Sequence, residues 1–295
     1  MTNRSPYRGR FAPSPSGPLH LGSLLSALGS YLDARAHGGE WLLRIEDIDP
    51  PRELPGADML IRRSLLAHGL RWDEEPLYQH TRSSAYDQAL AWLLCHGHAY
   101  YCTCSRQQLD TGNSLHSSGC PRSEERPAEP AAVRLRGAIE QTFFNDSMLG
   151  PVTLANAADA ADFVLLRKDR LYSYQLAVVI DDAGQQISDV IRGRDLLSST
   201  PCQIHLQRLL GLRVPRYGHL PLLLNEQGQK LSKQNRARAL DDASAPANLL
   251  RCLVALGQPS PPETIRTDCA AILDWATQHW DRARIPANDS VPREE

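Results

Sequence analysis

Residues 8–45 read RGRFAPSPSGPLHLGSLLSALGSYLDARAHGGEWLLRI. Residues 8–11 are suited to a short strand, and the three prolines and one glycine of residues 12–18 exclude a helix in the next segment. Apolar residues then recur at helical spacing over 23–36, two glycines stop that helix, and residues 41–45 predict a second strand. Strand, turn, helix and strand form a βαβ unit, so this stretch predicts a parallel sheet and an α/β fold.

The composition of the whole chain is that of a globular protein. Of its 295 residues, 42% are hydrophobic and 22% are charged, which excludes a largely disordered chain. With 32 Lys and Arg against 34 Asp and Glu, the formal net charge of −2 does not indicate nucleic-acid binding, although a local basic stripe can still bind phosphates. We expect a cytoplasmic protein with no membrane span, because there is no long apolar run, no signal-peptide pattern, and an odd number of cysteines, seven.

Further elements follow the first unit. Helices are expected at 56–68, 83–96 and 200–210, from the spacing of their apolar residues. Residues 160–193 return to strand-like runs, including the apolar stretch 171–182, and another apolar strand is expected at 220–224.

The turn at residues 11–23 is a candidate phosphate site. An α/β fold presents backbone N–H groups and the positive end of a helix to phosphates at this position. Gly22 allows a ligand to approach the backbone, and His20 can donate to a phosphate oxygen. Taken alone, the turn is better interpreted as an ordinary βα connection with a surface histidine.

A second loop changes that interpretation. Residues 230–234 read KLSKQ, and two lysines three apart supply point charges suited to a triphosphate, although a lone pair of this kind is most often solvated. Together with residues 20–23, HLGS, this loop resembles the HIGH and KMSKS signatures of class I aminoacyl-tRNA synthetases. The resemblance implies ATP with its accompanying Mg²⁺ as substrate, and catalytic or ATP-binding roles for His20, Gly22, Ser23, Lys230 and Lys233.

Residues 10–22, RFAPSPSGPLHLG, and 43–49, LRIEDID, resemble the glutamyl-tRNA synthetase family more narrowly. The resemblance implies that the amino-acid substrate, L-glutamate, is held by Arg10, Phe11, Ala12, Pro13, Ser14, Glu46, Tyr174 and Arg192. Glutamate carries two carboxylates and one ammonium group, so guanidinium groups and a counter-carboxylate suit it chemically. For Glu46 the alternative is a solvated strand end, and for Tyr174 it is a core position in a strand.

A group of metal-ligating residues lies in the polar stretch after residue 100: Cys102, Cys104, His116 and Cys120. Three thiolates and an imidazole can close a tetrahedral, structural zinc site, and the alternative is three free cysteines in a loop. The resemblance to the truncated paralogues of glutamyl-tRNA synthetase implies zinc at similar spacing, with tyrosine as a fourth ligand in that family. His116 occupies the matching place, and His96 and His98 are nearby alternatives.

The resemblance covers residues 8–245 and implies a domain organisation. We expect a Rossmann-like nucleotide-binding catalytic domain with a parallel sheet, a zinc-bearing insertion and a short helical C-terminal segment without an anticodon-binding domain. The boundaries are 1–99 for the first half of the catalytic domain, 100–130 for the zinc-binding insertion, 131–245 for the rest of the insertion and the second half, and 246–295 for the C-terminal segment.

Typical members of the family continue into a large helical anticodon-binding part, whereas about fifty residues follow position 245 here. The chain therefore resembles the truncated paralogues, monomeric ATP-dependent ligases that activate glutamate without tRNA and attach it to queuosine in the anticodon loop of tRNA(Asp). Three alternative functions remain. The first is a synthetase that charges a tRNA 3′ end, the second is a zinc-containing RNA-binding module with a decayed site, and the third is a nucleotidyltransferase that makes a small metabolite.

Overall fold

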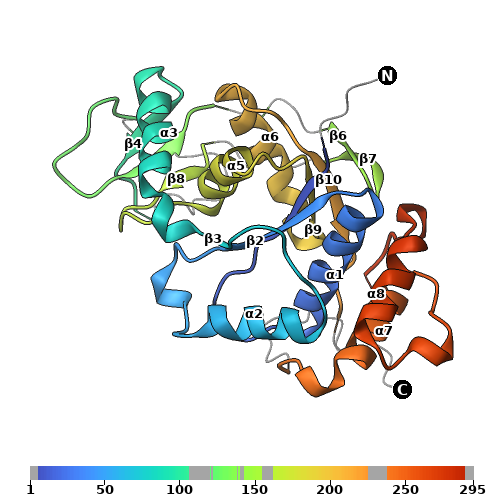
Figure 1. Ribbon diagram of the computed structural model, residues 1–295. Coiled ribbons are helices and arrows are strands. Elements are labelled where there is room, and N and C mark those ends of the chain that lie inside the picture. The colour runs from blue at the N-terminus through green and yellow to red at the C-terminus, as the bar shows by residue number, and fades with distance from the viewer. Residues whose placement is uncertain are drawn as a thin grey trace.

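The first βαβ unit forms the start of a parallel sheet in the computed structural model, which describes residues 6–105, 120, 122–137, 139, 143–154, 162–224 and 238–289. Strand β1 (Arg8–Phe11) pairs in parallel with β2 (Glu40–Ile45), and helix α1 (Leu21–Ala36) connects them (Figure 1). Strand β2 pairs in parallel with β3 (Leu77–Tyr78). The parallel arrangement predicted from residues 8–45 is confirmed.

The second half of the sheet lies on the other side of β1. Strands β9 (Asp189–Gly193) and β10 (Arg216–Leu220) pair in parallel, and the Ser188 N–H donates to the Arg8 carbonyl at 2.9 Å, which places β9 beside β1. The spatial order β3-β2-β1-β9-β10 is that of a doubly wound nucleotide-binding fold. All these strands end at one edge, where ligands bind in such folds.

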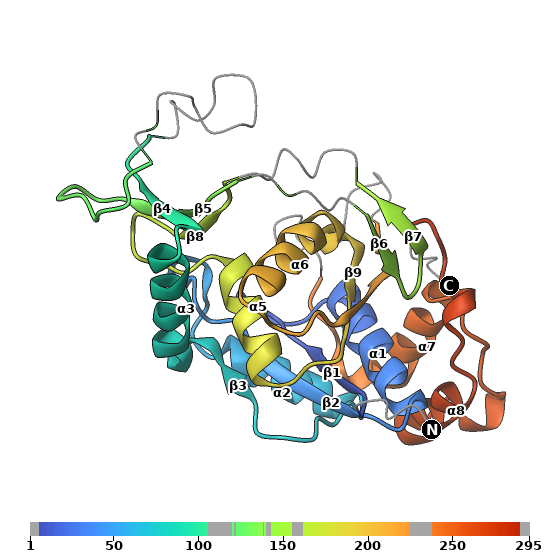
Figure 2. The same cartoon turned by 90° about the horizontal axis from the view of Figure 1, so that it is seen from above.

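A separate antiparallel sheet belongs to the segment inserted between the two halves. It consists of β4 (Ala99–Cys102), β5 (Ala132–Leu135) and β8 (Val164–Leu166). Figure 2 shows it at the end of the molecule opposite α7 and α8. The hairpin of β6 (Phe143–Asp146) and β7 (Gly150–Thr153) instead joins the main sheet beside β10.

Helices pack around the main sheet and on one another. Besides α1 they are α2 (Ala57–Ala67), α3 (Ser83–Cys95), α5 (Tyr174–Gly184), α6 (Thr200–Leu209), α7 (Ala245–Ala255) and α8 (Cys269–Gln278). Helix α1 packs against β1, β2 and β9, α7 and α8 pack against α1, and α3 packs against α5 and β4. The helices predicted at 56–68, 83–96 and 200–210 are therefore confirmed. Short 3₁₀ turns occupy Pro50–Arg52, Gln79–Arg82, Arg194–Ser199, Asp242–Ser244, Glu263–Ile265 and Arg282–Arg284. Among the described helices, none has the length and apolar character to cross a membrane.

Two strand predictions are wrong. The apolar run within 171–182 belongs to helix α5, whose first turn is capped by Ser173, the side chain of which accepts from the Leu176 N–H at 3.3 Å. Neighbouring residues 176–179 are all buried between α3, α6 and the insertion sheet, and a helix buried on every side loses the periodicity that distinguishes it from a strand. The strand expected at 220–224 is also misplaced: β10 spans Arg216–Leu220 and ends there, because Pro221 has no N–H to donate.

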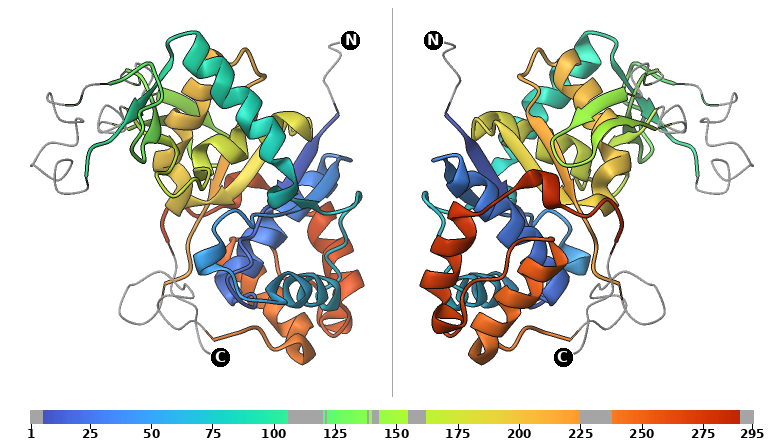
Figure 3. Two further views of the ribbon diagram at one scale, coloured as in Figure 1. Left: turned by 90° about the vertical axis from the view of Figure 1, so that its left-hand side faces the viewer. Right: turned by 90° about the vertical axis from the view of Figure 1, so that its right-hand side faces the viewer.

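The main core joins the first βαβ unit to the C-terminal helices. Leu24 and Leu28 of α1 share one buried apolar cluster with Leu249 of α7 and Ile272 of α8. Figure 3 shows α7 and α8 beside α1 in both views. Gly29 lets α1 approach β10 closely, since a Cβ at this position would lie 2.5 Å from the Leu220 side chain.

Candidate active site

The βα turn after β1 is fixed to the segment that follows β2. The Glu46 N–H donates to the Pro13 carbonyl at 3.0 Å, and the Leu54 N–H donates to the Pro15 carbonyl at 2.9 Å. These bonds hold Ser14 and Glu46 on the wall of the same cavity. Two segments that the sequence resemblance assigned to one ligand thus lie together at the carboxyl ends of β1 and β2.

His20 caps helix α1. The helix begins at Leu21, two residues earlier than expected, and His20 Nδ1 accepts from the Ser23 N–H at 3.1 Å. Gly22 therefore lies in the first helical turn, where free backbone N–H groups can bind an anion. His20 also pairs with Ala239, where the described chain has just resumed, whereas Lys230 and Lys233 fall outside the described residues.

A buried charge network of Arg10, Arg44 and Asp182 lies next to Glu46. Arg10 donates to both oxygens of Asp182, at 3.0 and 3.3 Å, and Arg44 donates to the same carboxylate at 2.6 Å. Burial disfavours a charged Asp182, but the guanidinium groups of Arg10 and Arg44 outweigh it and hold the pKa of this carboxyl below its usual value. The Asp182 carboxylate therefore orients both arginines.

Glu46 lies at the edge of this network with less compensation. Its carboxylate is 3.9 Å from Arg44 Nε, a buried nitrogen with no hydrogen-bond partner among the described residues. Burial raises the pKa of Glu46 to about 7, against the opposing attraction of Arg44 and Arg10. A carboxyl group in this state gains strongly from a cationic ligand, because an ammonium group would favour its ionised form.

Arg192 and Tyr174 lie across the cavity from the turn. Every nitrogen of the Arg192 guanidinium donates a hydrogen bond, to His219 Nε2 (3.2 Å), Tyr174 Oη (3.2 Å), Gln203 Oε1 (2.7 Å), Thr200 Oγ1 (2.8 Å) and the Leu196 carbonyl (3.3 Å). Because the Tyr174 oxygen accepts from Arg192, its own hydrogen is available for a ligand. Burial raises the pKa of Tyr174, so the hydroxyl stays protonated.

The cavity has a volume of about 1050 Å³ and brings together only part of the predicted set. Ala12, Ser14, Glu46 and Tyr174 line it, while Arg10 and Arg192 stand behind these residues. Phe11 instead belongs to the apolar core and stacks on Trp41, with 6.3 Å between ring centroids. The Pro13 carbonyl accepts the hydrogen bond from the Glu46 N–H, as described above. His20 and Gly22 do not line this cavity.

Several supporting residues were not anticipated from the sequence. His219 is buried, its Nε2 accepts from Arg192, and its Nδ1–H donates to Asp146 at 2.5 Å. Burial lowers the pKa of His219, so the imidazole is neutral. The sequence signal for Asp182 was the acidic pair Asp181–Asp182 at the end of an apolar run, whereas nothing in the local sequence marks His219.

Three cysteines form a cluster that could hold a metal ion, and two of them, Cys102 and Cys104, line the same cavity. The Sγ atoms of Cys102, Cys104 and Cys120 lie within 4.8 Å of one another, which fits thiolates around one zinc ion at about 2.3 Å each. Burial raises the pKa of Cys120 to about 12, with the neighbouring thiols acting in the same direction. Among the described residues only these three belong to the cluster, so His96 and His98 do not; His116 lies outside the described residues.

Comparisons with known proteins agree with this architecture. Residues 7–259 match the family model described as tRNA synthetases class I (E and Q), catalytic domain. A protein of Pseudomonas fluorescens named glutamyl-Q tRNA(Asp) synthetase is 49% identical over 98% of this chain and 96% of its own length. A protein of Pseudomonas aeruginosa with the same name is 48% identical over 98% of this chain and 99% of its own.

Among solved structures, a glutamate tRNA ligase from Elizabethkingia meningosepticum, crystallised with its amino acid, superposes with a TM-score of 0.79. It is 26% identical, and the match covers 98% of this chain and 67% of the ligase. The chain belongs to the class I tRNA synthetases of the E and Q type, and within them to the family of proteins named glutamyl-Q tRNA(Asp) synthetase.

Proposed function

We propose that this protein activates L-glutamate with ATP, without tRNA, and transfers the glutamyl group to queuosine in the anticodon loop of tRNA(Asp). The names of its relatives and the amino acid bound to the solved glutamate ligase support this proposal. The observation that carries it is the placement of Glu46 and Tyr174 on one cavity wall, each backed by a buried arginine.

Each group of glutamate has a partner in this arrangement. The substrate ammonium pairs with the Glu46 carboxylate, whose raised pKa reports an uncompensated buried acid. A substrate carboxylate accepts from the Tyr174 hydroxyl, which Arg192 polarises. Arg10 supplies the second cation: Asp182 holds its Nε and Nη2, and within the described structure Nη1 makes no hydrogen bond.

The reaction needs positioning and charge stabilisation more than a side-chain nucleophile. A carboxylate oxygen of glutamate attacks the α-phosphorus of ATP, the bond to pyrophosphate breaks, and glutamyl-adenylate forms. A queuosine hydroxyl then attacks the activated carbonyl, loses its proton, and releases AMP. His20, Gly22 and Ser23 at the start of α1 bind the phosphates, with Lys230 and Lys233 as further cations.

Metal ions have separate roles in the proposal. Mg²⁺ arrives with ATP and neutralises phosphate charge. Zinc is held by Cys102, Cys104 and Cys120, with His116 as fourth ligand, and ties the start of the insertion to residues that follow it. The enzyme works as a cytoplasmic monomer.

Two assays test the proposal in sequence. ATP–pyrophosphate exchange should proceed with glutamate in the absence of RNA and be much weaker with glutamine, which lacks the second carboxylate. Labelled glutamate should then go onto tRNA(Asp) that carries queuosine and not onto an unmodified transcript, and periodate should abolish acceptance by opening the cyclopentenediol. Efficient transfer to the 3′ adenosine of tRNA(Glu) would instead establish an ordinary glutamyl-tRNA synthetase.

A further inference from the structure

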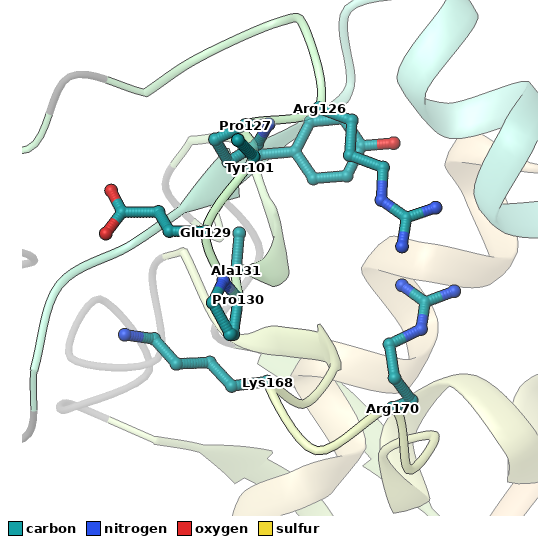
Figure 4. Close-up of a pocket in the computed structure, with 9 residues that line it drawn as sticks. Tyr101, Arg126, Pro127, Glu129, Pro130, Ala131, Lys168 and Arg170 are labelled. Carbon is teal, nitrogen blue, oxygen red and sulfur yellow. The ribbon is translucent and has the colours of Figure 1, made fainter.

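A second pocket of about 240 Å³ lies on the antiparallel insertion sheet (Figure 4). Tyr101 of β4 forms one side, residues 126–131 before β5 form another, and Lys168 and Arg170 from the turn after β8 complete it. None of these residues comes from the parallel sheet that carries the proposed glutamate site. The pocket is therefore a feature of the insertion.

Two arginines in this pocket lack the carboxylate partners that the neighbouring Arg167 has. Figure 4 shows the guanidinium groups of Arg126 and Arg170 pointing toward one another, while the carboxylate of Glu129 points away. Within the described part of the chain, neither arginine side chain makes a hydrogen bond or an ion pair.

The cations beside them are already engaged. Arg167 pairs with Asp49 at 3.2 Å and with Asp169 at 2.5 Å. Lys168 Nζ donates to the Thr103 carbonyl at 2.6 Å. The pocket thus has two exposed guanidinium groups that face one another without a carboxylate partner, and an oxyanion between them can accept from both.

The backbone holds one of these arginines in place. Arg170 has a φ of 69°, a left-handed conformation that L residues with side chains adopt only against steric resistance. The turn is closed by two hydrogen bonds, from the Arg170 N–H to the Arg167 carbonyl at 3.0 Å and from the Arg167 N–H to the Leu171 carbonyl at 2.9 Å. Figure 4 shows that the Arg170 side chain extends from this turn toward Arg126.

The pocket also has an apolar side and a connection to the large cavity. The ring of Tyr101 and the prolines at 127 and 130 offer a surface on which a base or ribose can pack. Lys168 lines both the pocket and the large cavity, so one polymer can occupy both without crossing the core. A nucleic acid strand combines the required features, namely regularly spaced phosphates and aromatic bases.

We propose that this pocket binds a backbone phosphate of the RNA acceptor between Arg126 and Arg170, with the adjoining nucleoside against Tyr101. The inference rests on the proposed function, because it assumes that an RNA nucleotide reaches the large cavity. It assigns Arg126, Arg170 and Tyr101 to the binding of one nucleotide, separate from the activation of glutamate.

The test uses the double variant Arg126→Ala/Arg170→Ala and a control that removes the same charge elsewhere, Arg208→Ala/Arg251→Ala, at two exposed helical positions. Glutamate-dependent pyrophosphate exchange should be the same in both and in the parent protein. The pocket variant should raise the KM for queuosine-bearing tRNA(Asp) about 10-fold with little change in kcat, and lower the slope of log KM against log salt concentration by about 1.

Direct binding of tRNA(Asp), measured by fluorescence anisotropy, separates this inference from the proposed function. If the parent protein binds the RNA but transfers no glutamate, the function fails, and loss of binding in the pocket variant alone still supports the pocket. Tyr101→Leu should weaken binding about 5-fold, whereas Tyr101→Phe keeps the ring and should not. Equal RNA affinity in the pocket and control variants would overturn the inference. So would millimolar inorganic phosphate that binds to the pocket without lowering the affinity of the protein for RNA.

Discussion

At the scale of single residues, Glu46 should give the reaction its pH dependence. Its pKa of about 7 is raised by burial, so the ligand-free carboxyl is largely neutral below that pH and cannot pair with the substrate ammonium. We expect kcat/KM for glutamate in pyrophosphate exchange to rise with pH, with a midpoint near 7, since this parameter reports ionisations of the free enzyme. Glu46→Gln should lower kcat/KM roughly 100-fold and remove the midpoint.

Asp47→Asn is a suitable control, because the Asp47 carboxylate bonds to the N–H and side chain of His80 and is not part of the cavity wall. This variant should keep the midpoint. A Glu46→Gln protein whose profile still turned near pH 7 would show that another group controls binding. The residue identities in this site were accessible from the sequence through family resemblance, but their ionisation was not, because it depends on burial and on Asp182, 136 positions away along the chain.

At the scale of elements, the cluster of Cys102, Cys104 and Cys120 brings β4 next to the segment before β5. Cys102 ends β4, and Cys120 is brought to it from 18 residues further along the chain. We expect about one zinc per chain, lost in Cys102→Ser and Cys120→Ser and weakened in His116→Ala. Cys95→Ser, an exposed thiol outside the cluster, should retain the metal. Metal analysis by mass spectrometry checks these outcomes, and zinc-free parent protein prepared without chelator would contradict the assignment.

The elements also show where sequence patterns reach their limit. Residues 8–45 carried their own turn signals and periodicity, so the first βαβ unit was predictable to within two residues at the start of α1. The run 176–179 carried no such contrast, because tertiary packing on all sides makes every position apolar. Ser173 was the available signal for a helix start there. Arg192 was named from the resemblance, but its hydrogen bonds to Tyr174, Gln203 and His219 required tertiary information, since these partners come from α5, α6 and β10.

At the scale of the whole molecule, the C-terminal segment is attached to the catalytic core by a buried acid. Asp33 of α1 accepts two hydrogen bonds from Arg282, both at 2.7 Å, and others from Tyr7 at 2.5 Å and Trp280 at 2.9 Å. Burial opposes the charge on Asp33, but Arg282 and the other donors outweigh it and hold the pKa of this carboxyl below its usual value. The network therefore stabilises the fold at neutral pH, and this contribution is lost as the pH falls through the lowered pKa.

Removing Arg282 should cost more than removing a surface arginine. Arg282→Ala leaves a buried carboxylate without its cation, which should lower the free energy of unfolding by roughly 3 kcal/mol at pH 7. Arg284→Ala breaks an exposed pair with Asp281 at 3.6 Å and should cost less than about 1 kcal/mol. Urea unfolding followed by circular dichroism measures both. Since protonation of Asp33 removes the buried charge, the difference between the variants should shrink in acid. A constant difference at all pH values would mean that the arginine stabilises through packing alone, and that the apolar contacts of α1 with α7 and α8 hold the C-terminal segment in place.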